Sequence, residues 1–201
     1  MKITTYEDKE SWFAGRRGKI TGTRLKDIIV KRGTGHKKGY YELIAERLAT
    51  EPEGDETAMD RGVRLEEEAI QKFVEITGKE LDTSLVIWSR DDNESIAISP
   101  DAFIGNKIAV EAKCLSSASH IEAWLTQEIP TEYQDQAIQY FVVNDELETL
   151  YFCFYDPRIP CKDFFWIEVS RESVKDKVAE YLAYERDTLA EINEIVNTLT
   201  F

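Results

Sequence analysis

The amino-acid sequence predicts an α/β fold in which a central mixed β-sheet is flanked by helices. Apolar residues recur at helical spacing up to about residue 77, and then in the pattern of short strands between residues 81 and 113. Helical spacing returns at 117–144, two aromatic-rich strands follow, and a long helix ends the chain. This order, in a chain of 201 residues without a repeat or an evident linker, predicts a single domain over 1–201.

The first third of the chain is expected to be helical. Helices are predicted at 21–33, at 40–49 and at 57–77, where Gly78 closes the third. The segment 33–39 is rich in glycine and in basic residues, so it is expected to be a basic loop. It lacks the Gly-Lys-Ser/Thr sequence of a nucleotide-binding phosphate loop.

The rest of the chain is expected to alternate between strands and helices. Strands are predicted at 81–88, 95–98, 102–104, 108–113, 149–155 and 164–169, and helices at 117–126 and 133–144. Ser170 is expected to cap a final amphipathic helix that runs to about Thr198. The apolar residues of that helix that are expected to face inward are Val174, Val178, Leu182, Leu189, Ile192 and Val196.

The charge of the chain is unevenly distributed. Its formal net charge is −14, which disfavours nucleic-acid binding if it is spread evenly. Residues 1–40, however, carry eleven Lys and Arg against four Asp and Glu, a net charge of +7, so the remaining residues carry −21. This asymmetry indicates one basic surface that contacts a polyanion, although a solvated helix face would give the same composition.

Composition also bears on where the protein works. No apolar run is long enough to cross a bilayer, and the N-terminus lacks the apolar core of a signal peptide. The three cysteines, Cys114, Cys153 and Cys161, have no paired spacing, which argues against a disulfide framework and a zinc site. We therefore expect a folded cytoplasmic protein with no membrane partner.

The most informative pattern is formed by Asp101, Glu111 and Lys113. Glu111 and Lys113 are two residues apart in a predicted strand, so their side chains face the same side, where Asp101 of the neighbouring strand can meet them. Two carboxylates beside an ammonium suit a divalent cation such as Mg²⁺ and predict metal-assisted hydrolysis. In isolation, Glu-x-Lys more commonly marks an exposed ion pair, so evidence from the rest of the chain is needed to distinguish a metal site from such a pair.

Five parts of the chain carry a family resemblance. They are 12–23, 62–66, the catalytic strands with 99–101 and 111–114, 133–140, and 155–158. Taken in order over about 12–169, they resemble the lambda-type phage alkaline exonucleases, the YqaJ-like viral recombinases of the PD-(D/E)xK nuclease superfamily. The resemblance implies a restriction-endonuclease-like central mixed β-sheet flanked by helices. It leaves the C-terminal helix at about 170–198 outside the matched region.

The resemblance implies the roles of the catalytic residues. Asp101 and Glu111 would bind Mg²⁺, or Mn²⁺ as a substitute, with the carbonyl of Ala112 as a further ligand. Lys113 would position the attacking water. Two more residues would reach the site from helices, Glu66 as a further metal or water ligand and Gln136 as a polar side chain facing the site. Outside the resemblance, either residue would be an ordinary solvated helix side chain.

The resemblance also implies the residues that bind DNA. Arg16, Thr23 and Ser99 would hold a terminal 5′-phosphate, and an arginine fork with hydroxyl donors suits a phosphate dianion. Thr23 stands where the family has Ser, which keeps the hydroxyl group. Arg32 would add a phosphate contact from the basic loop. Met59 would be an apolar wedge at the duplex end, although a core methionine explains it equally well.

The function implied is a Mg²⁺-dependent 5′→3′ exonuclease that resects linear double-stranded DNA and leaves a 3′ single-stranded overhang for recombination. The resemblance further implies a homotrimeric ring, a single-strand annealing protein as partner, and a phage or prophage origin in a bacterial host. Two alternative hypotheses about the function remain open. One is another PD-(D/E)xK nuclease, such as an endonuclease or a Cas4-like enzyme, although the latter needs four cysteines. The other is a catalytically silent protein that binds DNA ends.

Overall fold

The computed structural model describes residues 8, 11, 14–17, 19, 27–28, 30, 33–51 and 58–199, except for the side chains of residues 58–61 and 63. The chain forms two compact units. The first unit comprises residues 1–65, 114–127 and 155–165, and the second comprises residues 66–113, 128–154 and 166–201. The expectation of a single domain over 1–201 stays a prediction. The helix expected at 21–33 lies largely outside the described residues.

Most residues of a four-stranded mixed sheet lie in the second unit. Its strands are β3 (Ala102–Ile104), β4 (Ile108–Lys113), β5 (Thr149–Tyr155) and β6 (Phe164–Ser170), which lie side by side in that order. β3 and β4 are antiparallel, whereas β4 and β5 are parallel. Four of the predicted strands therefore form this sheet, and the strand predicted at 95–98 forms within β2 (Asn93–Ile98) of a separate sheet. The expected α/β class with a mixed sheet flanked by helices is confirmed.

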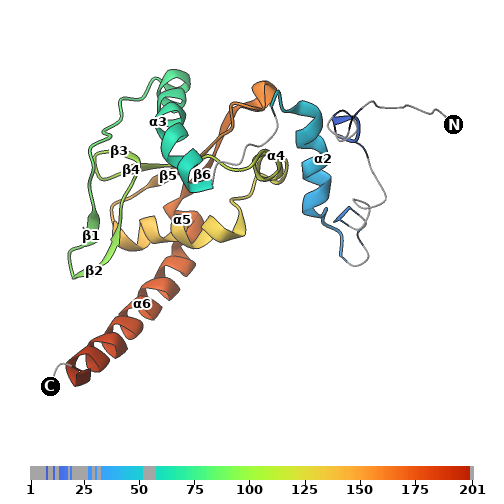
Figure 1. Ribbon diagram of the computed structural model, residues 1–201. Helices are drawn as coiled ribbons and strands as arrows, with labels where there is room; N and C mark the ends of the chain where they lie inside the picture. Colours follow the sequence, from blue (N-terminus) through green and yellow to red (C-terminus); the bar gives the residue numbers. More distant parts are fainter. Residues whose placement is uncertain are drawn as a thin grey trace. The chain divides into compact units, whose positions relative to one another are not determined.

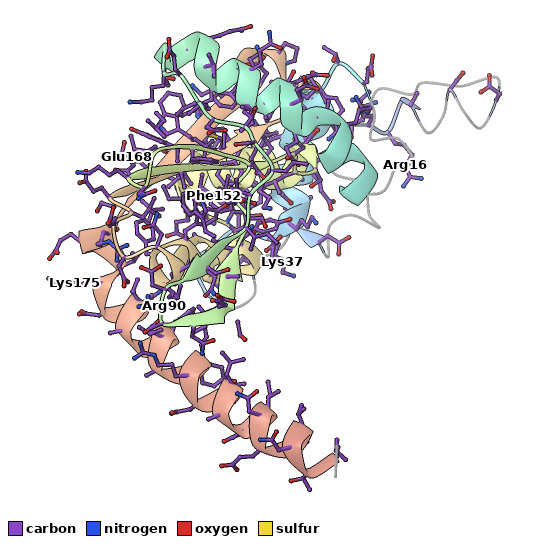
Figure 2. All side chains as sticks on the ribbon, turned by 90° about the vertical axis from the view of Figure 1, so that its left-hand side faces the viewer. Arg16, Lys37, Arg90, Phe152, Glu168 and Lys175 are labelled. Carbon is purple, nitrogen blue, oxygen red and sulfur yellow. The ribbon has the colours of Figure 1, made fainter. Side chains whose placement is uncertain are left out.

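Two helices pack against the sheet from opposite sides (Figure 1). Phe73 of α3 (Ala58–Thr77) lies with its ring centroid 5.1 Å from that of Tyr151 in β5, and Tyr133 of α5 (Thr131–Val143) lies 6.3 Å from Phe152. Neighbouring residues of a strand point to opposite faces, so α3 and α5 cover different faces. Phe152, labelled near the centre of Figure 2, is fully buried.

The prediction of a strand at 81–88 is wrong. Strand β1 covers only Trp88–Arg90 and pairs with β2 (Asn93–Ile98) in a separate two-stranded sheet. Upstream of it, Asp82 makes an isolated bridge to Phe103. The carboxylate of Asp82 accepts a hydrogen bond from the main-chain N–H of Ser84 at 2.9 Å, which turns the backbone locally and competes with strand pairing.

The final helix, α6 (Arg171–Leu199), packs on α5 with apolar residues as far along as Leu189. The main-chain N–H of Ser173 donates to Ser170 Oγ at 3.3 Å, so the predicted N-cap is confirmed. Val178, Leu182 and Leu189 pack against a buried cluster of Ile96, Ile138, Val142 and Val143.

The prediction that Ile192 and Val196 face inward is wrong, because these residues are 46% and 49% exposed. α6 has 29 residues and α5 only 13. At 1.5 Å per residue, the end of α6 extends beyond its partner helix.

The end of α5 is held by two arginines of the second unit. Arg90, labelled in Figure 2, donates to the carbonyl of Val142 and pairs with both carboxylate oxygens of Asp145 at 2.9 Å. Arg171 donates to the carbonyls of Phe141, Asn144 and Leu147. Carbonyl groups at a helix C-terminus lack partners within the helix, so these guanidinium groups stabilise the end of α5.

The first unit is built around α2 (Lys38–Leu48) and α4 (Ser117–Thr126). Its core contains Tyr41, Ala45, Ala118, Ile121 and Ile159, and the short helix η2 (Pro160–Lys162) follows. No helix among the described residues is long and apolar enough to span a membrane.

The Tyr-Asp-Pro-Arg segment at 155–158 has a structural role in this unit. The buried carboxylate of Asp156 accepts hydrogen bonds from Ser117 Oγ at 2.5 Å and from Arg158 Nε at 2.9 Å. Both donors lie in the same unit, so Asp156 connects the start of α4 to the turn that follows β5.

Candidate active site

Asp101 and Glu111 are brought together by the pairing of β3 with β4. Asp101 directly precedes β3, and the antiparallel register places Ala102 opposite Val110, so Asp101 lies beside Glu111. The main-chain N–H of Ala112 donates a hydrogen bond to Asp101 Oδ2 at 2.7 Å. The two carboxylates are thus ten positions apart in sequence and adjacent in space, as the sequence predicts.

Glu111 is the most buried charged group of this site, with 2% of its surface exposed. Its Oε1 atom accepts hydrogen bonds from Lys113 Nζ at 2.5 Å and from Gln136 Nε2 at 2.7 Å. Its Oε2 atom accepts a hydrogen bond from the hydroxyl of Tyr140. Glu111 pairs with Phe152 across the sheet, so its side chain faces α5, the helix that supplies Gln136 and Tyr140.

The site holds more negative charge than its own cations offset. Burial, and then the charge of Glu111, raise the pKa of Asp101 to about 7, although the Ala112 N–H opposes this shift. Partial burial and the charge of Glu111 also raise the pKa of Glu66, which lies in α3. Burial, followed by the charge of Glu111, raises the pKa of Tyr140, so its hydroxyl stays protonated and donates.

Lys113 is held between a carboxylate and an aromatic ring. It extends from the end of β4 on the same face as Glu111, and its Nζ atom lies 5.2 Å from the ring centroid of Tyr133 in α5. An ammonium group over a tyrosine face is attracted by the ring quadrupole. The ion pair and the ring together restrict the position of the Lys113 ammonium group.

The donor set suits a hard divalent cation. Carboxylate and carbonyl oxygens are the ligands that Mg²⁺ prefers, and it keeps several waters when few protein ligands are present. Burial, and then the charge of Glu111, raise the pKa of Asp101, and a bound cation would oppose both effects by favouring the ionised carboxylate. Among the described residues, no group of three or more His, Cys, Asp and Glu side chains is arranged to hold a metal ion, so a bound Mg²⁺ needs water or main-chain ligands as well.

The structure brings six of the predicted residues into one neighbourhood of the second unit. Ser99 is exposed two residues before Asp101, and its carbonyl accepts a hydrogen bond from the Tyr140 hydroxyl at 3.4 Å. The others are Asp101, Glu111, Ala112, Lys113 and Gln136. The side chain of Glu66 keeps much of its surface exposed, although partial burial, followed by the charge of Glu111 at this site, raises its pKa. The catalytic roles of these residues stay predictions.

The predicted DNA-binding residues other than Ser99 belong to the first unit. Arg16 is half-buried there. Thr23 and Arg32 lie outside the described residues, and the side chain of Met59, in α3, lies outside the described side chains. Their roles also stay predictions.

Two residues that contact the catalytic set have no role assigned from the sequence. They are Tyr140, which donates to Glu111, and Tyr133, whose ring faces Lys113. Both lie on the helix of Gln136, at positions three before and four after it. Residues at that spacing share one face of a helix, so the prediction that Gln136 faces the site would have identified them.

Comparisons with known proteins identify a family and exonuclease structures of similar fold. Residues 11–146 match the family model of the YqaJ-like viral recombinase domain. An alkaline exonuclease from Laribacter hongkongensis, LHK-Exo, has a similar structure, with 26% sequence identity, a TM-score of 0.56, and 95% of this chain and 100% of that chain covered. LHK-Exo in complex with dAMP is similar at 27% identity and a TM-score of 0.61, over 96% of this chain and 98% of that one. The comparison with curated proteins found no match.

Proposed function

Because the chain belongs to the YqaJ-like viral recombinase family, we propose that it is a Mg²⁺-dependent exonuclease that degrades double-stranded DNA from its ends in the 5′→3′ direction. A nuclease role is supported by the family and by the two exonuclease structures of similar fold. Beyond this nuclease role, we propose the dependence on Mg²⁺, the 5′→3′ polarity and a product with a 3′ single-stranded overhang.

One observation carries the catalytic part of the proposal. Asp101, Glu111 and Lys113 converge at the paired ends of β3 and β4, with Glu111 almost fully buried. Burying carboxylates close together costs free energy, and a protein without chemistry to perform has no need of this arrangement. The set therefore favours an active nuclease over a catalytically silent protein that binds DNA ends.

The residues have separable tasks in hydrolysis. Asp101 and Glu111, with the carbonyl of Ala112, would hold Mg²⁺, which when bound polarises a phosphate oxygen and lowers the pKa of a water molecule. Lys113 orients the attacking water and offsets the negative charge that develops at the phosphate. Gln136 and Tyr140 donate to Glu111 and so fix the direction of its oxygen atoms. Glu66 adds negative charge beside the pair and is the candidate for a second metal or its water.

The direction of degradation depends on how an end is recognised. Arg16 and Thr23 are proposed to bind a terminal 5′-phosphate, and Arg32 a further phosphate. Ser99 is proposed as a separate hydroxyl donor to DNA phosphate. Met59 is proposed to separate the last base pair. We also propose, on the family resemblance, a homotrimeric ring and a single-strand annealing protein that receives the 3′ overhang, in the cytoplasm of a bacterial host.

A digestion assay tests the proposal. Linear and covalently closed circular duplexes of equal sequence are incubated with the protein in Mg²⁺, in Mn²⁺ or in chelator, and each strand of the linear duplex carries one label at its 5′ end and a different label at its 3′ end. We expect metal-dependent release of 5′-terminal nucleotides from linear DNA and an intact circle. Cleavage of the circle would indicate an endonuclease, and loss of label from the 3′-terminal side first would overturn the 5′→3′ polarity.

A further inference from the structure

His36 and Tyr40 form a parallel ring stack at the surface of the first unit. Their ring centroids are 3.9 Å apart and their planes differ by 11°. Tyr41 meets both rings edge-on, with its centroid 6.4 Å from that of His36 and 5.4 Å from that of Tyr40. Tyr41 is buried in the core between α2 and α4, whereas His36 is exposed. A buried tyrosine thus anchors a stack that ends in an exposed imidazole ring.

The stack lies on a basic loop. Residues 33–38 are all exposed, include Lys37 and Lys38, and contain no acidic residue. The loop runs into the start of α2 in Figure 1, and Lys37 is labelled in Figure 2. A flat ring next to two ammonium groups offers both kinds of contact that single-stranded nucleic acids use, namely base stacking and phosphate attraction.

A purely structural role explains this geometry less well. A ring stack that serves stability alone gains most when both of its outer faces are removed from water. Here the outer ring remains exposed, and the partner that supports it, Tyr40, is only half-buried. The exposed ring is preformed and immobilised, which lowers the entropic cost of stacking a further planar group on it.

We propose that the exposed ring of His36 is a stacking platform for an unpaired base of single-stranded DNA, with Lys37 and Lys38 beside the neighbouring phosphates. The proposal rests on the proposed function, which generates a single strand from a duplex. In a duplex only the two terminal base pairs have an uncovered face, whereas any base of a flexible single strand can turn a face toward the ring. Because every base has a π face, the platform is tolerant of sequence.

Fluorescence anisotropy with two matched probes tests the platform. One probe is a short oligothymidylate, and the other is an abasic strand of the same length that keeps every sugar and phosphate. The full chain is assayed in Ca²⁺ and without Mg²⁺, so that the strands are not degraded. We expect His36→Ala to weaken binding of oligothymidylate about tenfold and to leave binding of the abasic strand unchanged, since one base stack is lost. We expect His36→Trp to restore binding.

Tyr184→Leu is the matched control, because Tyr184 is an aromatic residue on α6 that is 72% exposed and outside the basic loop. It should change neither affinity. The platform is overturned if wild-type protein binds the two strands equally, or if His36→Ala and Tyr184→Leu have the same effect. A protein that digests linear duplex but shows either result retains the proposed function and loses only the platform. A protein that neither digests duplex nor binds either strand overturns both.

Discussion

The main-chain N–H of Ala112 donates a hydrogen bond to Asp101 Oδ2 at 2.7 Å, and this bond joins the residue before β3 to the strand that carries Glu111, the other carboxylate predicted to be catalytic. Asp101 lies before β3 and Ala112 lies within β4. The separation of Asp101 from Glu111 is therefore set by strand register and not by the length of the turn between them. Changes that keep the register but alter the carboxylates should therefore remove metal binding and chemistry without unfolding the protein.

Neutralising either carboxylate should stop digestion while the fold is kept. Asp101→Asn and Glu111→Gln preserve shape and remove one negative charge, so a divalent cation loses a charged ligand. We expect the rate of nucleotide release from linear duplex to fall at least about 100-fold in Mg²⁺, with an unchanged circular-dichroism spectrum. Near-native digestion by either variant would show that the active site is elsewhere.

Mg²⁺ should stabilise the wild-type protein against heat. The folded site concentrates the charges of Asp101, Glu111 and Glu66, so a ligand cation binds the folded state in preference to the unfolded one. We expect Tm to rise with Mg²⁺ concentration in differential scanning fluorimetry.

Asp101→Asn should remove the repulsion between this carboxylate and its acidic neighbours. Without metal, its Tm should exceed that of the wild type by about 2–4 °C for each kcal/mol of repulsion removed, and its Tm should no longer rise with Mg²⁺. A variant that keeps this increase would exclude Asp101 as a metal ligand.

The ring of Tyr133 should matter for turnover because it faces Lys113. Lys113→Ala should lower kcat by orders of magnitude while Mg²⁺ still raises Tm, because the carboxylates remain. Tyr133→Leu removes the cation–π contact, which is worth about 0.5–2 kcal/mol, so kcat should fall between about twofold and thirtyfold. Tyr133→Phe keeps a ring and should retain most of the activity. If the Leu and Phe variants have equal kcat, the ring does not position Lys113.

Tyr140→Phe separates hydrogen bonding from packing at Glu111. The substitution keeps the buried ring and removes the only atom that donates to Oε2 of Glu111 in the described contacts. Loss of a hydrogen bond to a buried charged group costs about 1–3 kcal/mol. We expect a lower free energy of unfolding in urea, together with reduced kcat. Gln136→Ala, which removes a donor to the other oxygen, is the comparison. A fully stable and active Tyr140→Phe would show that Lys113 and Gln136 suffice.

Local pattern was enough to predict the strands around the catalytic residues. β3, β4 and β5 have the predicted bounds, because each is a short apolar run between clear turn residues. The same reasoning failed at 81–88, where an apolar run at 85–88 follows three polar residues, Asp82, Thr83 and Ser84. There a side chain to main chain hydrogen bond between Asp82 and Ser84 redirects the backbone, and strand pairing depends on partners that the local sequence does not reveal.

The catalytic set was predictable only in part for a related reason. Strand alternation places Glu111 and Lys113 on one face, but the helix that this face meets depends on tertiary packing. For that reason Gln136 could be assigned only by resemblance, and Tyr133 and Tyr140 received no role. Similarly, helical periodicity identifies the apolar stripe of α6 but not the length of the helix it packs against, so Ile192 and Val196 were expected to be buried.

Arg16 and its neighbour Arg17 provide a matched pair for the recognition of a 5′-phosphate. The guanidinium of Arg17 donates to the carbonyl of Ala49 at 3.1 Å, a contact within the first unit, so Arg17 serves as the control. An arginine fork makes two parallel hydrogen bonds to a phosphate, which an ammonium group cannot reproduce. We therefore expect Arg16→Ala, and to a lesser degree Arg16→Lys, to reduce the preference for 5′-phosphorylated over 5′-hydroxyl duplex ends in competitive digestion, while Arg17→Ala keeps it. Binding of all three variants should remain salt-sensitive, since internal phosphates are still contacted. A wild type with no such preference, or equal effects of Arg16→Ala and Arg17→Ala, would contradict a phosphate site at Arg16.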